Sequence, residues 1–60
     1  MMTPIEALQI ALKRENQSEK LYADWAAKHP AIRELCTALA GEEQQHAAKI
    51  RKRLAEIEVN

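Results

Sequence analysis

The chain has few of the residues that interrupt or cross-link a fold. Its 60 residues include one glycine, two prolines, one cysteine and no phenylalanine. A single cysteine excludes both an internal disulfide and a four-thiolate metal site. A lone chain of this length buries only about 60% of the surface of its unfolded form. We therefore expect a partner chain, a metal, or both to stabilise it.

Net charge and long hydrophobic runs are missing as well. Nine lysine and arginine residues balance nine acidic residues. We expect no nucleic-acid partner, because nonspecific binding to nucleic acid depends on positive charge. The longest run without a charged residue covers only 35–41, too short to span a membrane, and the N-terminus has no signal-peptide pattern. We expect a cytoplasmic protein that does not enter a membrane.

What the sequence does contain is typical of helices, because Ala, Leu, Glu, Gln, Lys and Arg dominate it. Thr3-Pro4-Ile5-Glu6 indicates a helix start, in which Thr3 caps the helix and Glu6 completes a capping box. His29-Pro30 is the one break that follows. The sequence predicts an all-α single domain over 1–60, with a helix over about 4–28, a turn at 29–30 and a helix over about 31–58. A turn this short makes the two helices antiparallel.

Charged residues lie in the middle of the apolar stripe of each predicted helix. At about 100° per residue, Glu15 is centred among Leu8, Ala11, Tyr22 and Ala26. Glu43 is centred on the second stripe and His46 lies on the same side one turn later, whereas Glu42 points toward the edge. The apolar members of that second stripe are Ile32, Cys36, Leu39, Ile50, Leu54 and Ile57. A buried carboxylate requires a partner.

Each of these three polar residues has a simple explanation of its own. Glu15 can pair with a lysine or arginine of a neighbouring helix, and Glu43 can hydrogen-bond His46 as a pair that fixes register. In an antiparallel hairpin, however, all three fall at one level. Four-helix carboxylate proteins bind two metal ions with one Glu from each of two helices and Glu-x-x-His from each of the other two. Two copies of this chain supply that set, and its oxygen and imidazole donors suit iron or manganese.

Two segments resemble the ferritin-like superfamily, and most closely its rubrerythrin branch. They are Ala11-Leu12-Lys13-Arg14-Glu15 with Tyr22, and Glu42-Glu43-Gln44-Gln45-His46. The resemblance covers about 5–57. It implies Glu15, Glu43 and His46 as metal ligands and two iron ions per dimer, with manganese or another divalent metal as an alternative. It also implies ferroxidase or peroxidase-type chemistry, in which Fe(II) is oxidised with oxygen or peroxide.

The chain also departs from the rubrerythrin pattern. It has one helix pair where rubrerythrins usually have two, which is similar to the encapsulated ferritins that build their site between subunits. We expect a homodimer, or a larger homo-oligomer, in which two hairpins form a ferritin-like four-helix bundle. Cys36 alone cannot form a rubredoxin-like domain, and we expect it to be a core residue.

Several roles stay open at this point. Glu19 is an accessory or metal-entry carboxylate, or it is solvated or salt-bridged. Tyr22 hydrogen-bonds a ligand carboxylate, or it is a core aromatic. Gly41 is expected to allow close helix approach beside the site. The alternative function for the whole chain is a non-enzymatic helical-bundle interaction module with a buried Glu/His core.

Overall fold

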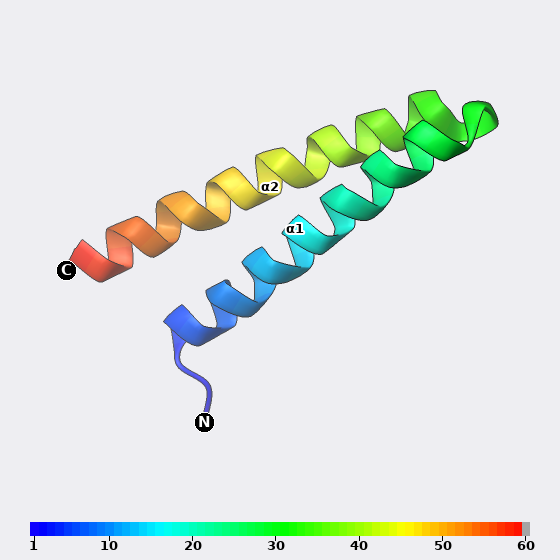
Figure 1. The fold of residues 1–60 in the computed structure, drawn as a ribbon. Coiled ribbons are helices and arrows are strands. Elements are labelled where there is room, and N and C mark those ends of the chain that lie inside the picture. Colours follow the sequence, from blue (N-terminus) through cyan, green and yellow to red (C-terminus); the bar gives the residue numbers. More distant parts are fainter. Residues whose placement is uncertain (60) are drawn as a thin grey trace.

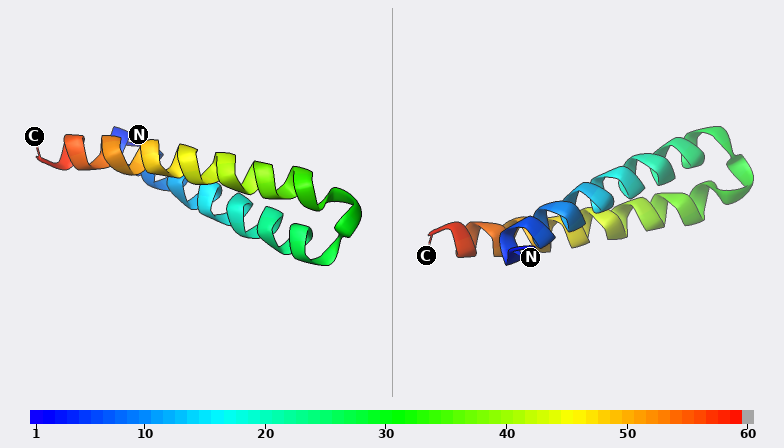
Figure 2. Two further views of the ribbon diagram at one scale, coloured as in Figure 1. Left: turned by 90° about the horizontal axis from the view of Figure 1, so that it is seen from above. Right: turned by 90° about the horizontal axis from the view of Figure 1, so that it is seen from below.

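The computed structural model describes the backbone of residues 1–59 and the side chains of residues 1–58. The chain folds into helix α1 (Pro4–Lys28), a 3-10 turn (Pro30–Ile32) and helix α2 (Arg33–Val59). The two long helices pack against each other as an antiparallel hairpin, with both termini at the same end (Figure 1). Views from above and below show that they cross at an angle in a single layer (Figure 2). The smallest extent of the molecule is 11 Å, about the diameter of one helix.

Helix α1 begins with a side-chain cap at Thr3. The Thr3 hydroxyl oxygen accepts a hydrogen bond of 3.1 Å from the backbone N–H of Glu6, as the sequence predicts. The reciprocal bond differs from a capping box, because the Glu6 carboxylate accepts from the Thr3 hydroxyl at 3.0 Å and not from a backbone N–H. The helix ends at Lys28, ahead of the His29-Pro30 break.

The connection between the helices is longer than the predicted turn. Residues 30–32 form a 3-10 helix, so α2 begins at Arg33. The Arg33 side chain donates from Nε to the carbonyl of Ala26 at 2.8 Å and from Nη2 to that of Ala27 at 3.4 Å. Carbonyls in the last turn of a helix have no partner within that helix. Arg33 therefore caps α1 from the first residue of α2.

The core of the hairpin is small. The buried apolar residues are Ala26, Cys36, Ala47 and Leu54, which confirms the core position expected for Cys36. Ile32, predicted to lie on the inner stripe, is 40% exposed, because it belongs to the 3-10 turn and not to α2. Ala47, which the sequence did not single out, is fully buried four residues after Glu43. No large side chain among residues 1–58 is fully buried.

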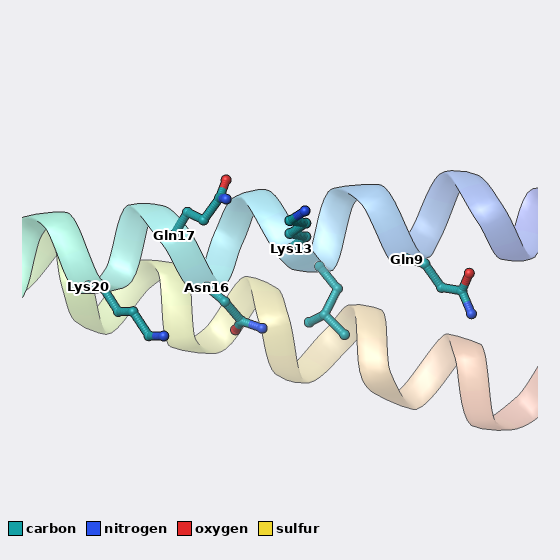
Figure 3. A pocket seen from close by; sticks show the side chains of 6 residues that line it. Gln9, Lys13, Asn16, Gln17 and Lys20 are labelled. Atoms are coloured by element: carbon teal, nitrogen blue, oxygen red, sulfur yellow. The ribbon is translucent and has the colours of Figure 1, made fainter.

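No atom of the described residues lies within 4 Å of the position that a Cβ would take at Gly41, so α1 does not make the close approach expected at this glycine. A hollow of about 410 Å³ lies along α1 and is lined by Gln9, Leu12, Lys13, Asn16, Gln17 and Lys20 (Figure 3). No helix in the described part of the chain is long and apolar enough to cross a membrane.

Candidate metal centre

Three potential metal ligands meet near the middle of the hairpin. One donor atom each from Glu15 on α1 and from Glu43 and His46 on α2 lie within 4.8 Å of one another. Glu43 and His46 are one turn apart and share a helix face, and antiparallel packing brings Glu15 to the same level. We call these three residues the donor cluster. Glu42, beside Glu43 in sequence, is exposed and lies outside it.

The donor cluster is open on one side. The side chains of Glu15 and Glu43 are 25% and 19% exposed, whereas that of His46 is 52% exposed. His46 Nδ1 lies 3.5 Å from Glu15 Oε2 and 3.5 Å from Glu43 Oε1. The imidazole therefore stands between two carboxylates and reaches solvent on its other side.

The donor cluster fits a divalent cation. Glu15 Oε2 is buried and accepts no hydrogen bond, although buried polar side-chain atoms nearly always have a partner. His46 Nδ1 is within ion-pair reach of it, but 3.5 Å exceeds the usual length of an N–H···O bond. Two carboxylates and an imidazole, with one oxygen unpartnered, form the mixed oxygen and nitrogen set that iron and manganese accept.

The two carboxylates of Glu15 and Glu43 also interact electrostatically. The pKa of Glu43 is raised above its ordinary value, first because its protonated carboxyl can donate a hydrogen bond to Glu15. Burial and the negative charge of Glu15 raise it further, and His46 partly opposes the shift. Two carboxylates this close favour a shared proton over two negative charges. A bound cation removes that conflict.

The recorded contacts of the two accessory residues from the sequence analysis, Tyr22 and Glu19, are with residues outside the donor cluster. Tyr22 is half-buried, and its ring centroid lies 5.8 Å from that of Trp25 in an edge-on contact. Within residues 1–58 its hydroxyl makes no hydrogen bond to the donor cluster. Glu19 Oε1 instead accepts a hydrogen bond of 2.9 Å from the amide nitrogen of Gln44 on α2. Sequence periodicity gave no signal for this pairing, because Gln44 is an exposed polar residue.

Comparison with protein families identifies a family that is consistent with a metal site at the donor cluster. The family model for rubrerythrin matches residues 6–60. The chain belongs to the rubrerythrin family. This confirms the resemblance to the ferritin-like superfamily, and iron is the metal that rubrerythrins usually bind. No curated protein and no solved structure matches the chain significantly.

Proposed function

We propose that this rubrerythrin-family chain is a di-iron carboxylate protein whose centre is shared between two copies, and that it oxidises Fe(II) with oxygen or peroxide. The observation that carries the proposal is the donor cluster, in which a buried Glu15 oxygen lacks a partner beside Glu43 and His46. Family membership supports iron as the metal.

A second copy is needed because one hairpin has half of a di-metal ligand set. Each copy contributes two carboxylates and one imidazole, so two copies provide the four carboxylates and two imidazoles of a four-helix carboxylate site. Four negative charges then neutralise two divalent cations. The half-exposed His46 places the donor cluster where another copy can reach it.

One face of the hairpin is suited to receive that copy. We define the open face as Leu21, Trp25, Ile32, Leu35 and His46. Leu35 is 61% exposed and precedes His46 by about three helical turns, so the two share a stripe of α2. Large exposed apolar groups that gather on one face mark an interaction surface.

The opposite side of the hairpin is already closed by polar contacts. We define the polar flank as Asn16, Glu19, Gln44 and Arg51. Arg51 Nη2 donates to Asn16 at 3.2 Å, and Gln44 donates to Glu19. Trp25 follows Asn16 by about two and a half turns, which puts the open face on the other side of α1. The second copy therefore packs on the open face.

The residues of the chain have distinct tasks in this function. Iron held by Glu15, Glu43 and His46 would supply the electrons that reduce oxygen or peroxide. Glu15 and Glu43 provide negative charge to hold the metal, and His46 provides a neutral imidazole. The pKa of Glu43 is raised when no cation is bound, so a metal ion that binds its carboxylate would displace a proton. A second copy over the open face keeps bulk water from the centre.

The test is metal content together with molar mass. Protein reconstituted anaerobically with Fe(II) is analysed by plasma mass spectrometry and light scattering. We expect about two irons per dimer, lost in His46→Ala and Glu43→Ala but kept in Glu42→Ala, a matched control beside the site. Oxidation of added Fe(II) by oxygen or peroxide is then followed optically. Retention of two irons per dimer in both ligand variants would refute the proposal.

The second candidate is a structural interaction module. The 3.5 Å approach of His46 to both carboxylates favours it, because these groups then serve as a polar register device. The two functions differ in their response to chelation. A metal that binds the folded state raises its stability, so a chelator lowers the melting temperature of the di-iron protein and leaves that of the interaction module unchanged.

A further inference from the structure

Glu19 is an acidic side chain close enough to Glu15 to become a further metal ligand. It follows Glu15 by four residues, so the two side chains are neighbours on one face of α1, with Cβ atoms about 5–6 Å apart. Glu19 is half-buried, yet among residues 1–58 it is not part of the donor cluster. Its carboxylate instead accepts the Gln44 amide at 2.9 Å.

Gln44 lies on α2 beside the donor cluster but on a different face of the helix. It directly follows Glu43, so its side chain leaves α2 on the polar flank, about 100° around the helix from the donor cluster. The bond draws the Glu19 carboxylate toward that flank. The other cross-helix bond of the polar flank, from Arg51 to Asn16 at 3.2 Å, involves no carboxylate.

We propose that Gln44 is a positioning residue that withholds Glu19 from the metal centre. The inference rests on the proposed function, because it assumes that the donor cluster binds metal. Two copies of the donor cluster already carry four carboxylates, which balance two divalent cations. Two further carboxylates from Glu19 would leave the centre negatively charged. The Gln44 amide prevents this by engaging Glu19 as a hydrogen-bond acceptor.

The test is a double-mutant cycle on Mn²⁺ affinity, measured by titration of the protein with electron paramagnetic resonance detection of free Mn²⁺. Gln44→Ala frees Glu19, and we expect it to tighten binding about three- to tenfold, or about 0.7–1.4 kcal/mol. Glu19→Gln alone is expected to leave the affinity within about twofold of the starting protein. The double variant is expected to return to that same value.

Arg51→Ala is the matched control, because it breaks the other cross-helix bond of the polar flank. We expect it to leave the Mn²⁺ affinity unchanged. A tenfold loss in Glu19→Gln would overturn the inference, since Glu19 would then be a ligand already. Equal tightening in Gln44→Ala with and without Glu19 would overturn it as well. If the starting protein binds no Mn²⁺ or Fe(II), the proposed function itself fails, which is a distinct result.

Discussion

At the scale of single residues, Glu43 lies where its charged form is disfavoured. Its carboxyl faces the Glu15 carboxyl across the two helices, and its pKa is raised mainly because its protonated form can donate a hydrogen bond to Glu15. Without a cation, the folded chain therefore holds a proton that the unfolded chain would release. Between the ordinary pKa and the raised one, the folded state binds more protons, so the free energy of unfolding falls as the pH rises.

We expect this effect to appear as a difference between two metal-free proteins. In Glu43→Gln an uncharged amide replaces the carboxyl, so the conflict with Glu15 is absent at every pH. At pH 4, below the ordinary pKa of Glu43, the two proteins should melt at similar temperatures. At pH 7 the variant should melt at a higher temperature than the unsubstituted protein. The unsubstituted protein has by then lost the proton of Glu43 and the stability that this proton gave the folded state. Thermal melts in a chelator at constant salt measure this, and a pH-independent difference would contradict it.

The residues of the candidate site differ in how far the sequence predicts them. Periodicity alone places Glu15 and Glu43 in apolar stripes, where a charge is out of pattern, and the structure brings both together with His46. The bonds of Gln44 and Arg33 were not predicted. Both side chains are polar and lie at polar positions, so their partners depend on how the helices cross, which a periodic pattern does not encode.

At the scale of elements, the hairpin depends on contacts at its turn. Arg33 opens α2 and caps the carbonyls of Ala26 and Ala27 in α1. The bounds of α1 follow from Thr3 and the His29-Pro30 break, and the structure has the predicted ones. The start of α2 does not follow from the sequence, because a proline at the first position suits a 3-10 turn as well as an α-helix.

Gly41 offers a test of helix α2 itself. Its backbone is helical without a positive φ, and the place of an added Cβ is open space. Gly41→Ala should therefore stabilise the protein by about 0.5–1 kcal/mol, because alanine loses less backbone freedom on folding. Denaturant unfolding followed by circular dichroism measures the change. A loss of stability would show that another chain packs against this position.

At the scale of the whole molecule, the hairpin is a single layer whose core consists mainly of small side chains. Two amphipathic helices in one layer bury one seam and leave other large apolar groups exposed, which here include Ile10, Leu21, Trp25, Ile32 and Leu35. The all-helical hairpin could be predicted from helix signals and one break. Its assembly remains a proposal, because an apolar side chain in a sequence does not reveal whether its neighbour is the same chain or another.

Leu35 tests that proposal. Leu35→Glu places a charge in the middle of the open face, and we expect the dimer dissociation constant to rise about tenfold or more. Gln9→Glu, which adds the same charge at the hollow of α1, should leave it unchanged. Sedimentation equilibrium over a range of concentrations measures both. Equal weakening by the two variants would indicate a general charge effect, and no weakening by either would place the interface elsewhere.

The presence of one donor cluster per hairpin has a genetic consequence. In a four-helix protein with both helix pairs in one chain, each ligand has its own codon, so the two halves of the centre can diverge. In a centre shared by two identical copies, each codon specifies two ligands, one in each copy. In the proposed dimer, every substitution at Glu15, Glu43 or His46 then changes both halves of the ligand set together, so the two halves cannot diverge in sequence.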